Sequence, residues 1–324
     1  MDKSLLFIAL VLYMILGIAA CDNDNNQGFE PVELRCGDNV TESSTKIVPP
    51  ESRKIITTSD VLNCSSTAVT LQGPSTLDLN GKTISCDGSA GTVGILLTGQ
   101  GATVKNGSVE NCEAGVLAVG EGEHTIENVE ARDNFGERDI ELPGGFVIVS
   151  NDNTLRNVTA NGNHPVGIQV VGDGNLVTNS EVSENDHMGI VIFGNSNEIS
   201  ETQANNNNYV NIAIINVINN ELVDGGNNNI ISNVKANNNN FSHGIFIGAN
   251  FNTISGSESS NNQISGIRVI GTNNTINSNV SLGNNKSVET GIDREGTDLS
   301  DPHPDCINTW QENDFVTSDS FCIQ

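Results

Sequence analysis

Three of the five histidines are the side chains best suited to metal binding or proton transfer. His164, His187 and His243 stand three, two and one residues before Gly167, Gly189 and Gly244, in that order. Each of these glycines forms a pair with the apolar residue that follows it. Imidazole nitrogens suit copper-type ions, so His164 and His187, which precede consecutive pairs of this kind, form a candidate metal site. Their offsets differ and no short ligand motif accompanies them, which fits ordinary surface histidines equally well.

Oxygen-bearing side chains near the N-terminus give a second candidate ion site. Four of them follow in part the spacing of a calcium-binding loop: Asp22, Asp24, Asn26 and Glu33. Gly28 comes one place late, however, and Pro31 opposes the helix that would have to follow. We interpret this segment as a linker. No cofactor is expected, and a copper-type or calcium ion is kept as the alternative.

The first twenty residues have the form of a lipoprotein signal. Lys3 is followed by an apolar run from Leu5 to Leu16, and the small residues of an Ile-Ala-Ala segment stand directly before Cys21. We predict that residues 1–20 direct export, that Cys21 carries lipid in the cell envelope, and that residues 21–30 form a polar tether. A plain signal peptide or a membrane-spanning anchor would explain the apolar run but not the placed cysteine.

The six other cysteines indicate disulfides, because an even number of cysteines in an exported chain seldom stays reduced. Sequence order suggests three local pairs: Cys36 with Cys64, Cys86 with Cys112, and Cys306 with Cys322. The chain is also strongly acidic, with 40 Asp and Glu against 14 Lys and Arg and a net charge of −26. This balance argues against nucleic acid as a partner, although it also simply keeps an exported surface soluble.

A recurring line of glycine, apolar residue, any residue and apolar residue predicts the fold. It starts at Gly94, Gly115, Gly145, Gly167, Gly189, Asn211, Gly244, Gly266 and Gly291, and its commonest spacing is 22 residues. Such a unit is too short for two helices and lacks a leucine framework. It fits one rung of a right-handed parallel β-helix. We therefore expect an all-β solenoid of about nine or ten rungs with disulfide-bonded caps.

Asparagines keep the phase of this repeat in two columns. One column lies eight residues after the repeat start: Asn153, Asn175, Asn197, Asn252 and Asn274. The other lies four residues before it: Asn163, Asn185, Asn207, Asn240 and Asn262. On strands stacked about 4.8 Å apart, amide groups can pass hydrogen bonds from rung to rung. The asparagine-rich segments are therefore predicted to be structural rather than disordered.

Alternation within the repeat strand separates a core face from an outer face. Ile190 and Ile192 are expected to point inward and Val191 outward. Each rung needs neighbours to bury its inner face, so both ends of the coil need caps. We expect an N-terminal cap over residues 31–68, the β-helix over residues 69–297 and a C-terminal cap over residues 298–324.

Two segments relate the chain to known proteins. Thr76-Leu77-Asp78-Leu79-Asn80-Gly81-Lys82-Thr83-Ile84 opens the coil, and Asp305-Cys306-Ile307-Asn308-Thr309-Trp310 closes it. With these segments, residues 60–324 resemble the NosD-type β-helix proteins and their pectate-lyase-like relatives. The resemblance implies an architecture rather than one activity, since lyases, hydrolases, epimerases and a copper-insertion accessory protein share it. Asp301-Pro302-His303 is similar to a motif of alginate epimerases but lacks their preceding Tyr-Gly-Phe, and we interpret it as chance.

The resemblance implies that, in enzymes of this architecture, catalytic side chains line the outward face of one sheet. The outward positions of the repeat strand carry no paired carboxylates, which argues against a glycosidase or lyase. Insertions around residues 134–143 and 219–228 flank an apolar part of this face. We predict a ligand groove there. Its floor is Gln169, Val171, Val191, Phe193, Ala213 and Ile215, and its rims carry Glu137, Asp139, Glu221 and Asp224.

These observations favour a non-catalytic, lipid-anchored envelope protein that binds a polysaccharide or an envelope protein along one side of the solenoid. The alternatives are a polysaccharide lyase, hydrolase or epimerase, and a copper or metal accessory protein. A homodimer that covers the apolar outer face is also compatible with the pattern. Phe193, Tyr209 and Phe246 are the aromatic residues best placed to stack on a sugar.

Overall fold

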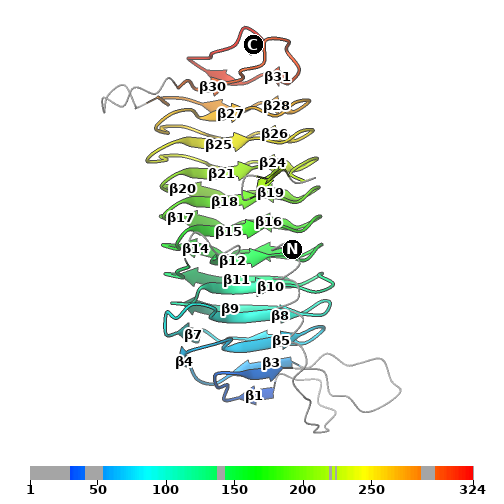
Figure 1. Ribbon diagram of the computed structural model, residues 1–324, viewed down its shortest axis with the longest axis vertical. Coiled ribbons are helices and arrows are strands. Elements are labelled where there is room, and N and C mark those ends of the chain that lie inside the picture. The colour runs from blue at the N-terminus through cyan, green and yellow to red at the C-terminus, as the bar shows by residue number, and fades with distance from the viewer. Residues whose placement is uncertain are drawn as a thin grey trace.

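The computed structural model describes residues 30–40, 54–136, 143–218, 221–222, 225–285 and 296–323. Within these ranges the secondary structure consists of strands, wound into a right-handed parallel β-helix that rises from β1 to β31 (Figure 1). The described residues include no helix long and apolar enough to cross a membrane.

The repeat strands form one side of the coil, an eleven-stranded parallel sheet that we call the repeat sheet. Its strands are β2 (Asp38–Val40), β5 (Val69–Gln72), β8 (Val93–Thr98), β10 (Ala114–Ala118), β12 (Gly144–Ile148), β15 (Val166–Val170), β18 (Met188–Ile192), β21 (Val210–Ile214), β25 (His243–Ile247), β27 (Ile267–Val269) and β30 (Leu299–Ser300). Ile168 lies opposite Ile190, and Gln169 opposite Val191, as the predicted rung alignment requires.

The other two sides belong to a 17-stranded sheet, the second sheet. One side contains β1 (Glu30–Val32), β3 (Lys54–Thr57), β6 (Thr76–Asp78), β13 (Thr154–Arg156), β16 (Leu176–Thr178), β19 (Glu198–Ser200), β24 (Ile230–Ser232), β26 (Thr253–Ser255), β28 (Thr275–Asn277) and β31 (Thr309–Gln311). The other contains β4 (Val61–Cys64), β7 (Thr83–Cys86), β14 (Thr159–Asn161), β17 (Glu181–Ser183) and β20 (Gln203–Asn205). The long strands β9 (Thr103–Glu110) and β11 (Thr125–Arg132) pass around the corner and pair on both sides. Short β29 (Val280–Ser281) and β32 (Asp314–Phe315) pair in parallel near the C-terminal end.

Strands occupy both segments that were expected to be caps. Residues 31–68 contribute β2, β3 and β4, and residues 298–324 contribute β30, β31 and β32. The repeat sheet is therefore slightly longer than nine or ten rungs. The predicted line at Gly291 lies outside the described residues, and the strand that pairs with β27 is β30.

A continuous hydrophobic core fills the coil. Ile168, Ile190, Ile212 and Ile245 have 0 % exposed surface, which confirms the predicted inward face. The repeat glycine is required by the same packing. A Cβ atom on Gly189 would lie 2.5 Å from the Asn207 side-chain nitrogen and from a carbonyl of the next rung. Glycine therefore lets the asparagine column approach the strand.

The first asparagine ladder comprises Asn153, Asn175, Asn197, Asn229, Asn252, Asn274 and Asn308. The backbone N–H of each member donates to the Oδ1 atom of the next at 2.7–2.8 Å. Each such bond contributes about 0.5–1.5 kcal/mol. The positions of the predicted column are confirmed, but main-chain donors carry it: in the described column, side-chain Nδ2 donors reach the next member only from Asn153 and Asn274.

The second ladder confirms all predicted members except one. In its middle part, Asn163 donates through its backbone N–H and its Nδ2 atom to Asn185 Oδ1, at 2.9 and 3.1 Å. Asn239, and not Asn240, occupies the ladder: Asn239 is buried and donates to Asn262 Oδ1 at 2.9 Å, whereas Asn240 is exposed. The prediction of Asn240 was wrong because this turn contains one extra residue before Gly244.

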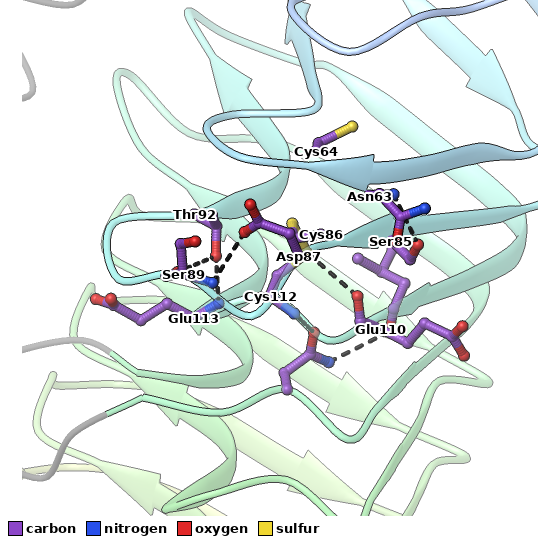
Figure 2. The surroundings of a disulfide bond; sticks show 12 residues. Asn63, Cys64, Ser85, Cys86, Asp87, Ser89, Thr92, Glu110, Cys112 and Glu113 are labelled. Carbon is purple, nitrogen blue, oxygen red and sulfur yellow. Dashed lines mark hydrogen bonds between the residues drawn. A yellow bond between two sulfur atoms is a disulfide. The ribbon is translucent and has the colours of Figure 1, made fainter.

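Disulfides join Cys36 to Cys64, Cys86 to Cys112 and Cys306 to Cys322, as predicted. Figure 2 shows Cys86 and Cys112 on neighbouring rungs, and Cys64 lies in register with Cys86 on the rung before. The Cys112 N–H donates to Asn134 Oδ1 at 3.1 Å, and Asn134 donates in turn to Asn163. The column of cysteines therefore continues directly into the second asparagine ladder.

Candidate binding surface

The turns that lead into the middle repeat strands carry exposed rings. A buried ladder asparagine fixes the start of this turn, so the next one or two residues take equivalent places on successive rungs. On the middle rungs these residues form two rows, which we together call the ring edge: Phe135 and His164 in one row, and His187, Tyr209 and Phe241 in the other.

Rings of neighbouring rungs contact one another within each row, with two pairs stacked and the third, Tyr209 and Phe241, tilted. The centroid separations are 4.8 Å for Phe135 and His164, 4.6 Å for His187 and Tyr209, and 5.9 Å for Tyr209 and Phe241. Stacking of this kind stabilises adjacent rungs. The same rings remain accessible, since Phe135, Tyr209 and Phe241 are 58, 37 and 39 % exposed. The ring edge therefore retains apolar surface that the fold itself does not bury.

The two histidines of the predicted metal site lie on adjacent rungs but in different rows. His164 Nδ1 lies 2.6 Å from Asp186 Oδ2, which orients the imidazole, whereas His187 stacks on Tyr209. Among the described residues, no three His, Cys, Asp or Glu side chains are grouped so that they could hold a metal ion. The geometry therefore brings His164 to a carboxylate, an arrangement suited to proton transfer.

The predicted groove floor is contiguous, and its two rows differ in access. The first row is buried, with exposed fractions of 8 % for Gln169, 2 % for Val191 and 1 % for Ala213. The second row is partly exposed and consists of Val171, Phe193 and Ile215. Most of these residues pack into one outer cluster with Val166, Val210 and Phe246. A ligand can reach only the second row without displacing protein atoms.

The predicted rims fall mostly outside the described residues, which include neither Glu137, Asp139 nor Asp224. The second insertion forms a small antiparallel hairpin of β22 (Val217–Ile218) and β23 (Glu221–Leu222). Glu221 therefore belongs to a hairpin strand that follows β21 closely in the chain.

The repeat sheet carries few charges. From β5 to β27, its described strands contain no Asp or Glu and a single Lys or Arg, Arg268. Arg268 donates to Ser300 Oγ at 3.1 Å, and Ser300 donates to Asp319 at 2.6 Å, so the guanidinium is tied to the C-terminal rung. A glycosidase needs two carboxylates and a lyase needs a base with a charge-stabilising group, and these strands provide neither set.

The Asp301-Pro302-His303 segment has a structural role. Asp301 is 2 % exposed, and its Oδ2 atom accepts hydrogen bonds from Trp310 Nε1 at 2.9 Å and Asn308 Nδ2 at 3.2 Å. Its Oδ1 atom accepts one from the His303 N–H at 3.0 Å. A carboxylate occupied in this way inside the last rung is not available to a substrate. The interpretation of the motif as a chance match therefore agrees with its geometry.

Phe135 and Phe241 were not among the residues selected from the sequence. Their signal is a ring one or two places after a ladder asparagine, as in Asn134-Phe135 and Asn239-Asn240-Phe241. It is visible only once the ladder members are known, and Asn134 and Asn239 had not been assigned to the ladder.

No protein-family model matches the chain, and no curated protein matches its sequence. Solved structures share its fold. The periplasmic alginate epimerase AlgG gives a TM-score of 0.62 at 12 % identity, over 82 % of this chain and 70 % of that one. The catalytic domain of a GH87 α-1,3-glucanase in complex with nigerose gives 0.60 at 12 % identity, over 94 % and 68 %. The A-module of the Azotobacter vinelandii mannuronan C-5 epimerase AlgE6 gives 0.56 at 14 % identity, over 90 % and 87 %. At such identities the likeness establishes the fold alone.

Proposed function

We propose that the protein binds a polysaccharide, without turning it over, along the side formed by the ring edge and the accessible row of the repeat sheet. The observation that carries this proposal is the exposure of Phe135, Tyr209 and Phe241 by 37–58 % on neighbouring parts of one edge. Aligned aromatic surface of this kind marks a ligand or partner site. Rungs recur about every 4.8 Å, so a polymer lying along the coil would meet equivalent positions repeatedly.

The class of ligand is supported by the fold neighbours, which include an alginate epimerase and an α-1,3-glucanase. An envelope protein is the alternative occupant of the same side. The absence of paired carboxylates on the described repeat strands from β5 to β27 supports binding rather than hydrolysis. The His164–Asp186 pair is the one observation that favours an enzyme, because a carboxylate-oriented imidazole is a usual general base.

Binding is tested on an array of purified polysaccharides and oligosaccharides. Changing Tyr209 and Phe241 together to alanine should weaken binding of the best ligand by about tenfold or more, because two exposed rings lose their contact. Phe321→Ala is the matched control, since Phe321 is 77 % exposed in the last rung and far along the chain from the ring edge. Equal affinity of the double variant and the control would overturn the proposed surface. Release of new reducing ends or unsaturated sugars that is lost in His164→Ala would establish the enzyme alternative instead.

We also propose that lipid on Cys21 holds this binding side at the cell envelope, on the strength of the apolar run and the Ile-Ala-Ala-Cys segment. Cys21→Ser should move the protein to the aqueous phase in detergent partitioning, because one lipidated cysteine would carry the chains that stable anchoring requires. A variant that stays in the detergent phase would contradict lipidation. Ser43→Ala, a polar change elsewhere in the chain, serves as the control.

A further inference from the structure

We infer that the polysaccharide bound at the ring edge is uncharged, without uronate or sulfate groups. This inference rests on the proposed function and names its ligand class. It separates the protein from the alginate-acting structures that share its fold.

The first support is the placement of cations. Lys105, Arg132 and Arg156 all lie on the second sheet, away from the repeat strands. Each already contacts a carboxylate: Lys105 lies 3.5 Å from Asp78, Arg156 lies 2.8 Å from Glu127, and Arg132 pairs with Glu110. These basic groups are paired with carboxylates of neighbouring rungs on the outside of the coil, and they belong to a different side of it.

The second support is the charge of the binding side itself. Its described repeat strands from β5 to β27 hold Arg268 as their single Lys or Arg, and Arg268 is hydrogen-bonded to Ser300. The ring edge contributes aromatic rings and one carboxylate, Asp186, whose side chain is 47 % exposed beside His164. Recognition of a polyanion uses arginine or lysine in paired contacts, and the described part of this side provides no such cluster.

The third support is the charge of the whole chain. At −26, the protein repels a polyuronate at a distance, and the repulsion is strongest at low ionic strength, where screening is weak. An uncharged glycan is not subject to this electrostatic repulsion. Its hydroxyl groups and C–H faces match the asparagine-rich turns and exposed rings of the edge.

The test compares oligosaccharides of equal length, uncharged α-1,3-glucan and mannan against polymannuronate and polygalacturonate, with the purified full chain. Calorimetry is run at pH 8, and each titration is repeated at low and high NaCl, with EDTA and with added calcium. We expect an uncharged ligand to bind with little salt dependence and with sensitivity to the Tyr209 and Phe241 changes. The acidic ligands should bind at least about tenfold more weakly than the uncharged ones. Added salt should reduce this difference in affinity.

The outcomes separate the two proposals. An acidic oligosaccharide that binds as tightly as the best uncharged one, with or without calcium, overturns the inference and leaves polysaccharide binding standing. Binding of neither class overturns the proposed function and the inference with it. Arg156→Gln is the control, because Arg156 lies on the second sheet and pairs with Glu127, so its change should leave both affinities unchanged.

Discussion

His124 is the residue that departs most clearly from its column. It heads the first ladder, and its backbone N–H donates to Asn153 Oδ1 at 2.9 Å. Its Nδ1 atom accepts from the Ala102 N–H at 3.1 Å, so the ring proton is on Nε2 and points to the Val119 carbonyl at 2.9 Å. Burial lowers the pKa of His124, and the hydrogen bond to Val119 opposes part of that effect.

We predict that this imidazole makes the fold sensitive to acid. In the unfolded chain the His124 imidazole binds a proton near pH 6.5, whereas in the folded protein its lowered pKa keeps it neutral to lower pH. The free energy of unfolding should therefore fall as the pH drops below about 6.5. His124→Asn should flatten that dependence, because an asparagine oxygen can accept from the Ala102 N–H without titrating. Urea unfolding of both proteins at pH 8, 6.5 and 5 measures the difference. Parallel pH profiles would show that His124 does not carry the effect.

At the scale of one strand, β18 tests how the outer face is packed. Ile190 points into the core and Val191 outward, yet both are buried, at 0 and 2 % exposure. Ile190→Ala should cost about 2–5 kcal/mol through the cavity it leaves. Val191→Ser should also be costly, roughly 1–3 kcal/mol, because it places a hydroxyl among apolar neighbours. Ile230→Ser, at a 44 % exposed outward position of β24, is the control and should change stability little. A Val191 variant as stable as this control would mean that the outer cluster is dispensable.

How far the elements could be predicted depends on what sets their phase. The inward isoleucines and most ladder asparagines follow from a 22-residue period that is marked by a recurring glycine. Asn239 was missed because Asn237, Asn238, Asn239 and Asn240 are chemically identical choices and one extra turn residue shifts the count. Burial of Val191 could not be derived, since alternation gives the direction of a side chain but not what lies above it.

The candidate site was predictable only in part. The floor residues were identified as neighbours from the same phase argument, and the register of β15, β18 and β21 places them so. His164 and Asp186 stand three residues before Gly167 and Gly189, so the repeat phase makes them neighbours, but the phase does not specify the contact between their side chains. The ring rows depend on turn conformation, which a periodic pattern does not specify.

For the whole molecule, the period itself is testable. Deleting residues 167–188 removes one complete 22-residue rung and joins Val166 to Gly189. In the shortened coil, Asn153 should donate to Asn197 and Asn163 to Asn207, so that both ladders continue across the junction. The coil should still unfold cooperatively. Deleting residues 167–187 is the matched control, since one residue too many shifts every later side chain relative to the rung before. Thermal unfolding should show a clearly lower Tm for the 21-residue deletion. Equal melting of the two would mean that the stack tolerates slippage.

The column in which cysteines give way to asparagines has a mechanical consequence. Cys36–Cys64 and Cys86–Cys112 each join two neighbouring rungs covalently, whereas the described rungs from Asn134 to Asn284 are held by hydrogen bonds and packing, and a disulfide returns only at Cys306–Cys322 in the last part of the coil. Under a tensile load along the chain, the disulfide-closed loops 36–64 and 86–112 could not extend, whereas the rungs after Cys112 could detach one at a time. The coil is thus stiffest beside the segment predicted to tether it, and any unwinding under load should start at the far end and stop at Cys112.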